Sequence, residues 1–134
     1  MTISNDNQIR IWAMLAHLTS LLWIPVSYTG LLSLPVVNLL GPSIIWLLKR
    51  KAHPFINHHV KESLNFQISI GIYFVVLAII IGISVSRSIN TLAALVILLS
   101  MVLYICLLIL VIRASVKAKQ GDFYRYPITI RFLR

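Results

Sequence analysis

Charged residues are absent from three long stretches of this chain, residues 11–48, 63–86 and 88–112, which contain no Asp, Glu, Lys or Arg. The stretches are 38, 24 and 25 residues long. A bilayer hydrocarbon core is about 30 Å thick, and about 20 apolar residues of helix cross it. Each stretch is therefore long enough to span a membrane at least once, and the sequence predicts an integral membrane protein.

The composition indicates one membrane domain over residues 1–134. Hydrophobic residues make up 59% of the chain and charged residues 11%, more apolar surface than one small soluble core could bury. We expect an all-α four-helix bundle with a short extended or interfacial C-terminal tail. The predicted segments are helices at about 8–24, 34–50, 61–86 and 90–119, an interfacial segment at 53–61 and a basic tail at 120–134.

The first charge-free stretch is long enough for two crossings. Pro25, Gly30 and Pro35 lie near its middle and predict a tight turn between two crossings. Gly41 and Pro42 interrupt the second of these helices, which could instead be a broken or re-entrant segment.

The distribution of basic residues predicts the orientation in the membrane. With four crossings, eleven of the twelve Lys and Arg residues share one side, and only Arg87 lies on the other. Basic residues stay cytoplasmic during insertion, so we expect a multi-pass protein of the inner or plasma membrane with both termini cytoplasmic. The residues expected to face lipid headgroups are Lys49, Arg50, Lys51, Lys117, Lys119, Arg125 and Arg131.

The net charge of +9 favours anionic lipid as a partner over nucleic acid. The cations flank the apolar stretches, as is typical of lipid contact, and do not alternate with aromatic residues in an RNA-binding motif. His53, His58 and His59 match no specific zinc spacing, so no metal or cofactor is predicted. No catalytic constellation is recognisable, and we expect a protein without enzymatic activity.

One face of the predicted third helix carries polar residues. These residues recur at helical spacing and are His58, Glu62, Asn65, Ser69 and Tyr73. Depth along antiparallel helices predicts an ion pair between Glu62 and Arg113 and a hydrogen bond between His17 and Asn65. We therefore predict a polar intramembrane cluster of His17, Glu62, Asn65 and Arg113.

This cluster has a structural and a functional interpretation. Paired polar groups would stabilise the bundle, and this interpretation is favoured because one polar layer makes no continuous path across a bilayer. The alternative is a small proton or solute transporter or channel that uses His17, Glu62 and Asn65.

The C-terminal tail alternates apolar and basic residues. Tyr126, Ile128, Ile130 and Phe132 would lie on one side of an extended segment, opposite the basic residues. We expect the tail to lie on the cytoplasmic membrane surface. A strand that docks a partner is the alternative, although Pro127 weakens a continuous ladder.

Several short motifs occur together in order along the chain. They are WAMLAHL at 12–18, Gly41-Pro42 followed by Trp46, His59 with Lys61-Glu62 and Asn65, and Tyr126-Pro127. In this combination the chain resembles small prokaryotic membrane proteins related to the four-helix subunit of the chloroplast Tic translocon. The motif positions that carry over are His17, Gly41, Pro42, Trp46, His59, Glu62, Asn65, Tyr126 and Pro127.

The resemblance implies a four-helix membrane fold and a subunit or helper in protein translocation or membrane complex assembly. On this basis we expect a membrane-protein partner or a homo-oligomer, because a bundle of this size fills its own interior. The translocation element rests on the resemblance alone.

Overall fold

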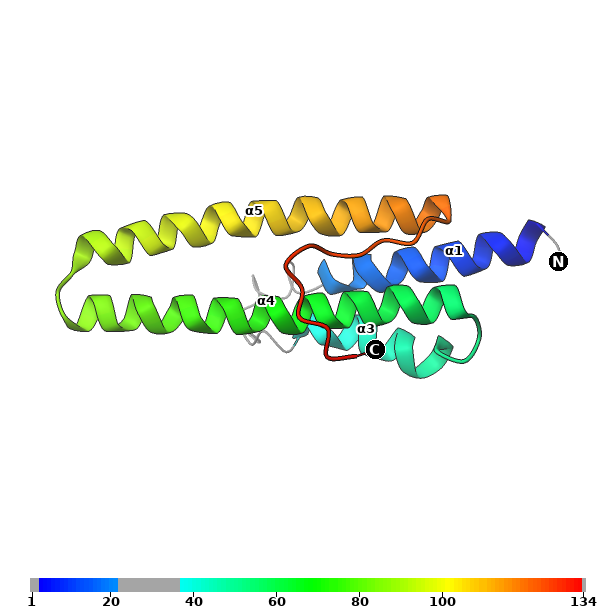
Figure 1. Ribbon diagram of the computed structural model, residues 1–134, viewed down its shortest axis with the longest axis horizontal. Helices are drawn as coiled ribbons and strands as arrows, with labels where there is room; N and C mark the ends of the chain where they lie inside the picture. Colours follow the sequence, from blue (N-terminus) through cyan, green and yellow to red (C-terminus); the bar gives the residue numbers. More distant parts are fainter. Residues whose placement is uncertain (1–2, 22–36, 134) are drawn as a thin grey trace.

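The computed structural model describes residues 3–21 and 37–133 of the chain. The described residues contain four α-helices and a short 3₁₀ helix (Figure 1). There is no β-strand in this part of the chain. The elements are α1 (Ile3–Leu18), η1 (Thr19–Leu21), α3 (Val37–Lys49), α4 (Pro54–Ser86) and α5 (Asn90–Gln120). The prediction of an all-α, four-helix membrane-type architecture is confirmed. The predicted turn at 25–35 and the adjoining ends of the first two predicted helices lie outside the described residues.

Helices α4 and α5 form a long antiparallel hairpin (Figure 1). Pro54 occupies the first turn of α4, and the His53 ring Nδ1 accepts a hydrogen bond from the Phe55 N–H at 3.1 Å, which caps the helix. Residues 54–61 of the predicted interfacial segment form the first turns of α4 and are continuous with the rest of the helix. Gly121, in the left-handed conformation at φ 92°, ends α5.

The hairpin supplies two helices that are long and apolar enough to span a membrane. Helix α4 has 33 residues and α5 has 31, lengths of about 50 and 46 Å at 1.5 Å per residue. Only 11% of the most apolar window of each helix is buried within the protein. A soluble core helix would bury such residues, so these side chains are placed to contact lipid.

Helices α1 and α3 pack beside one half of this hairpin only (Figure 1). They have 16 and 13 residues in the described range, fewer than the number needed for a full span. The buried side chains between α1, α3 and α4 form one apolar core and consist of Ala16, Ile45, Ile56, Val60 and Leu64. The other half of the hairpin projects beyond α1 and α3.

Gly41 allows α3 to approach the end of α1 closely. A Cβ atom at this position would lie 2.5 Å from Thr19 Cβ and 2.8 Å from the Thr19 carbonyl oxygen. Because no side chain fits in that space, the close helix contact explains the glycine of the Gly41-Pro42 motif.

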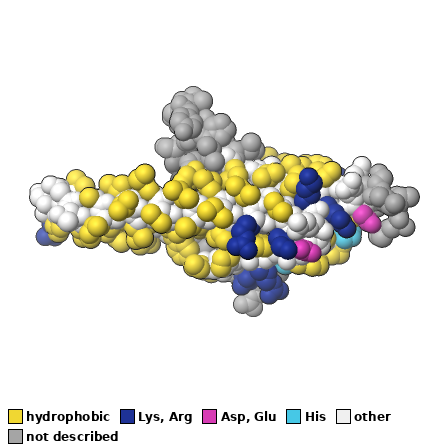
Figure 2. Space-filling model, turned by 90° about the horizontal axis from the view of Figure 1, so that it is seen from above, with side chains coloured by type: hydrophobic (Ala, Val, Ile, Leu, Met, Phe, Trp, Pro, Cys, Tyr) yellow, Lys and Arg dark blue, Asp and Glu magenta, His cyan; other side chains and the backbone are white. Residues whose placement is uncertain are grey.

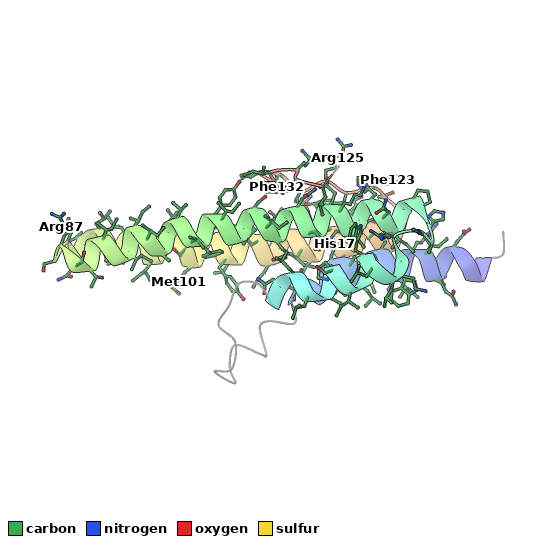
Figure 3. The ribbon with its side chains drawn as sticks, turned by 90° about the horizontal axis from the view of Figure 1, so that it is seen from below. His17, Arg87, Met101, Phe123, Arg125 and Phe132 are labelled. Atoms are coloured by element: carbon green, nitrogen blue, oxygen red, sulfur yellow. The ribbon has the colours of Figure 1, made fainter. Side chains whose placement is uncertain are left out.

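Charge is distributed unevenly along the molecule. Lys and Arg side chains gather over the half where α1 and α3 pack, and the projecting hairpin is almost wholly apolar (Figure 2). Arg87 lies at the tip of the hairpin (Figure 3). The charged residues are therefore concentrated at one end of the molecule, and the projecting half of the hairpin is apolar.

Candidate functional site: the polar face of α4 and the tail

Residues 121–133, here called the tail, follow α5 without regular secondary structure and lie along the side of α4 (Figure 3). Five polar side chains at helical spacing on α4 hydrogen-bond to this tail. They are His58, Glu62, Asn65, Ser69 and Tyr73, the same residues that the sequence places on one face. The polar face is therefore a binding track for the protein's own tail.

Asn65 makes the densest set of contacts. Its Oδ1 accepts hydrogen bonds from the backbone N–H groups of Phe132 and Leu133 at 3.0 and 2.8 Å, and its Nδ2 donates to the Leu133 carbonyl at 2.9 Å. The amide side chain is buried, so these bonds satisfy a group that would otherwise be costly to place there. The expected bond between Asn65 and His17 is replaced by this clamp on the tail.

Glu62 is buried and binds the tail in two ways. The N–H of Tyr126 donates to Glu62 Oε2 at 3.3 Å, and Arg131 Nε donates to Oε1 at 3.2 Å. The predicted ion pair between Glu62 and Arg113 does not form, since Arg113 is exposed on α5. The correct partner of Glu62 is a cation from the tail.

The tail runs outward along α4 and then returns. His58 Nε2 lies 3.3 Å from the Tyr124 carbonyl, and the Tyr73 hydroxyl donates to the Ile128 carbonyl at 3.0 Å. The return begins there, because the next contact is between the Ile130 N–H and Ser69 Oγ at 2.9 Å, one turn back along α4. The turning point is Ile128, which has a positive φ of 59°.

A buried hydrogen-bonded chain joins the tail to α1 and α4. The Tyr126 hydroxyl lies 3.0 Å from His17 Nδ1, and His17 Nε2 lies 2.9 Å from His59 Nδ1. Tyr126 also stacks on Phe66, with ring centroids 3.8 Å apart. The motif residues His17, His59 and Tyr126 thus belong to one hydrogen-bonded chain. No sequence pattern indicated that these three residues meet.

The pKa of the Tyr126 hydroxyl is raised well above its usual value of 10.0. Burial is the largest cause, and the nearby Tyr124 and Glu62 add to it. The phenol therefore stays protonated at physiological pH and keeps its hydroxyl hydrogen available to His17.

Of the seven cations expected to face lipid headgroups, Arg131 pairs with Glu62, and the other six occupy three kinds of position. Lys49 lies over the Trp12 ring and Arg50 over the Trp46 ring, at 4.8 and 4.4 Å from the ring centroids. These cation–π pairs give the Trp46 motif position a local role. Lys51, Lys119 and Arg125 are exposed, and exposed Lys117 pairs with Asp122 at 2.9 Å.

In the described residues, no three His, Cys, Asp or Glu side chains come together as a possible metal site. His53 and His58 make the contacts given above, and His17 and His59 bond each other. The four histidines are thus engaged in contacts within the protein.

Four helices, two of them apolar enough to span a bilayer, and a basic end define a small α-helical membrane protein. A sequence model of the MamF/MmsF family, described as the magnetosome magnetite crystal formation protein family, matches residues 8–133. The chain belongs to this family. A search of curated proteins and a search of solved structures found no match.

The family match corrects the resemblance to Tic-related proteins. The residues that carry the resemblance, from His17 to Pro127, lie inside the matched residues 8–133. The match gives no support to protein translocation or to transport through a His17, Glu62 and Asn65 site.

Proposed function

We propose that this protein is a non-enzymatic structural component of the membrane in which magnetite crystals form. The family context supports a role in crystal formation, and the outward-facing apolar hairpin supports residence in the bilayer. The observation that carries the structural role is the use of the α4 polar face. Each of its five polar side chains binds the tail, which favours a rigid scaffold over a site for an external substrate.

The proposed topology has both termini on the cytoplasmic side of the membrane. The basic residues cluster at the end of the molecule opposite Arg87, and such clusters are retained in the cytoplasm. In this orientation the basic end contacts anionic lipid headgroups. The projecting half of the hairpin contacts lipid chains, another membrane protein or a second copy of this chain.

Complementation tests this function. We would express the chain in a magnetite-forming bacterium that lacks its own members of the family and measure crystal size and number by electron microscopy. Restored crystals, with the protein in the crystal-bearing membrane fraction, are the expected result. Asn90→Ala, at the exposed hairpin end, is a control substitution that should complement as well as the wild-type chain. Normal membrane insertion with no change in the crystals would contradict the proposal.

A further inference from the structure

We infer that the tail is a re-entrant arm, which enters the hydrocarbon of the near leaflet at Ile128 and returns to the headgroup region at Arg131. The partner of this surface is the lipid itself, with acyl chains around the apolar side chains and phosphate groups near the two arginines. This inference rests on the proposed membrane crossing of α4. It replaces the expectation that the tail lies flat on the cytoplasmic surface.

The depth of the turning point follows from its contact with α4. Tyr73, which binds the Ile128 carbonyl, lies 14 residues before Arg87 at the hairpin tip, or about 21 Å along the helix. A hydrocarbon core of about 30 Å then places the Tyr73 Cα about 9 Å inside the near boundary. By the same measure Glu62 lies outside this boundary, at the level of the headgroups.

Backbone in this region must have its polar groups satisfied by protein. The N–H of Ile130 is bonded to Ser69 and the carbonyl of Ile128 to Tyr73. The N–H groups of Phe132 and Leu133, bonded to Asn65, lie where the arm has returned to the headgroups. Irregular backbone at membrane depth is tolerated only under this condition. The side chains of Ser69 and Tyr73 thus satisfy backbone polar groups of Ile130 and Ile128 on the segment that enters hydrocarbon.

The side chains that point away from α4 suit lipid. Ile128 is 81% exposed, and Phe132 is 52% exposed. Ile72 and Val75, which flank Tyr73 on α4, are also exposed apolar side chains. Arg125 points away from the bundle in Figure 3, so its long stem can carry the guanidinium to the phosphates.

The residue at the turning point also favours lipid over water. A left-handed φ of 59° is unfavourable for a β-branched residue, and glycine or asparagine is the usual choice at an aqueous turn. Ile128 has neither the flexibility of glycine nor a polar side chain. Contact with acyl chains gives an exposed isoleucine a favourable environment here.

Cysteine accessibility in the full chain tests the inference. In a Cys106→Ala background, single cysteines would replace Ile128, Asp122 at the basic end, and Ile79 on the exposed span of α4. Each variant would be placed in nanodiscs of phosphatidylcholine and phosphatidylglycerol and labelled with a charged maleimide, its rate normalised to that in SDS. Hydrocarbon suppresses the thiolate, so we expect Ile128→Cys to react about tenfold more slowly than Asp122→Cys.

The Ile79→Cys control separates the two proposals. A protected Ile79→Cys with an Ile128→Cys that reacts as fast as Asp122→Cys would overturn the re-entrant arm and leave the crossing of α4 intact. A fast Ile79→Cys would instead overturn the crossing. Adding Asn65→Ala and Ser69→Ala to Ile128→Cys should undock the arm and restore fast labelling, and continued protection would also contradict the inference.

Discussion

Asn65 hydrogen-bonds to both the backbone N–H and the backbone carbonyl of Leu133. Its Oδ1 accepts from the Leu133 N–H at 2.8 Å and its Nδ2 donates to the Leu133 carbonyl at 2.9 Å. An asparagine side chain matches a peptide unit in this way because it has the same donor and acceptor. The pairing fixes Leu133 of the tail against α4.

Asn65→Ala should release this part of the tail. Three hydrogen bonds to Phe132 and Leu133 are lost, and we expect the free energy of unfolding to fall by about 2–4 kcal/mol. Amide hydrogen exchange at Phe132 and Leu133 should accelerate, while exchange in α5 stays slow. Asn90→Ala is the matched control, and equal effects of the two variants would argue against the clamp.

Glu62 should couple energetically to Arg131 and not to Arg113. The Arg131 side chain is 43% exposed, so solvent screening limits the coupling to about 1 kcal/mol or less. A double-mutant cycle with Glu62→Gln and Arg131→Gln measures it through unfolding in mixed micelles. The parallel cycle with Arg113→Gln should give no coupling, and the reverse pattern would restore the originally predicted ion pair.

Tyr126 should make the fold sensitive to alkaline pH. Its pKa is raised in the folded protein above 10.0, so the folded state holds this proton more tightly than the unfolded chain. The resulting stabilisation is complete below pH 10 and is lost as the pH rises from there towards the folded pKa. Thermal unfolding monitored by circular dichroism across this range tests the expectation.

Tyr126→Phe is the variant for this pH experiment. It keeps the stack on Phe66 but loses the hydroxyl contact with His17, and should cost about 1 kcal/mol at neutral pH. The alkaline loss of stability should become shallower in this variant and persist in Tyr124→Phe. An identical pH dependence in wild type and Tyr126→Phe would assign the effect to other groups.

Gly41→Ala should separate α3 from the end of α1. The added methyl group would meet Thr19 Cβ at 2.5 Å, and we expect a loss of about 1–3 kcal/mol from overpacking. Gly82→Ala is the control, because a Cβ there has nothing within 4 Å. In that helix alanine should be neutral or slightly stabilising, so a smaller loss at Gly41 than at Gly82 would contradict the packing argument.

The long charge-free stretches were sufficient to predict α4 and α5, because helix length and bilayer thickness are directly comparable. Periodicity also placed Glu62, Asn65 and Tyr73 on one face of α4. Periodicity could not show what this face binds. Its partners are backbone groups of the tail, and every residue carries such groups, so no sequence pattern marks them.

The error at Arg113 has a related cause. Depth arithmetic gives the level of a residue along its helix but does not show the direction in which it points, and Arg113 faces outward from α5. Arg131 reaches Glu62 because the tail turns at Ile128. Ile128 has a left-handed φ, and isoleucine in a sequence does not predict such a turn. Alternation in the tail indicated two faces, but its return path depended on tertiary contacts.

The docking of the tail on α4 also sets an order of events during biosynthesis. Residues 124–133 leave the ribosome only after α4 and α5 have been made, so Glu62 and Asn65 enter the translocation machinery before their partners exist. Until the tail arrives, these two side chains depend on water or on insertion factors for hydrogen bonds. Chains that stop before residue 124 would leave Glu62 and Asn65 without these hydrogen bonds.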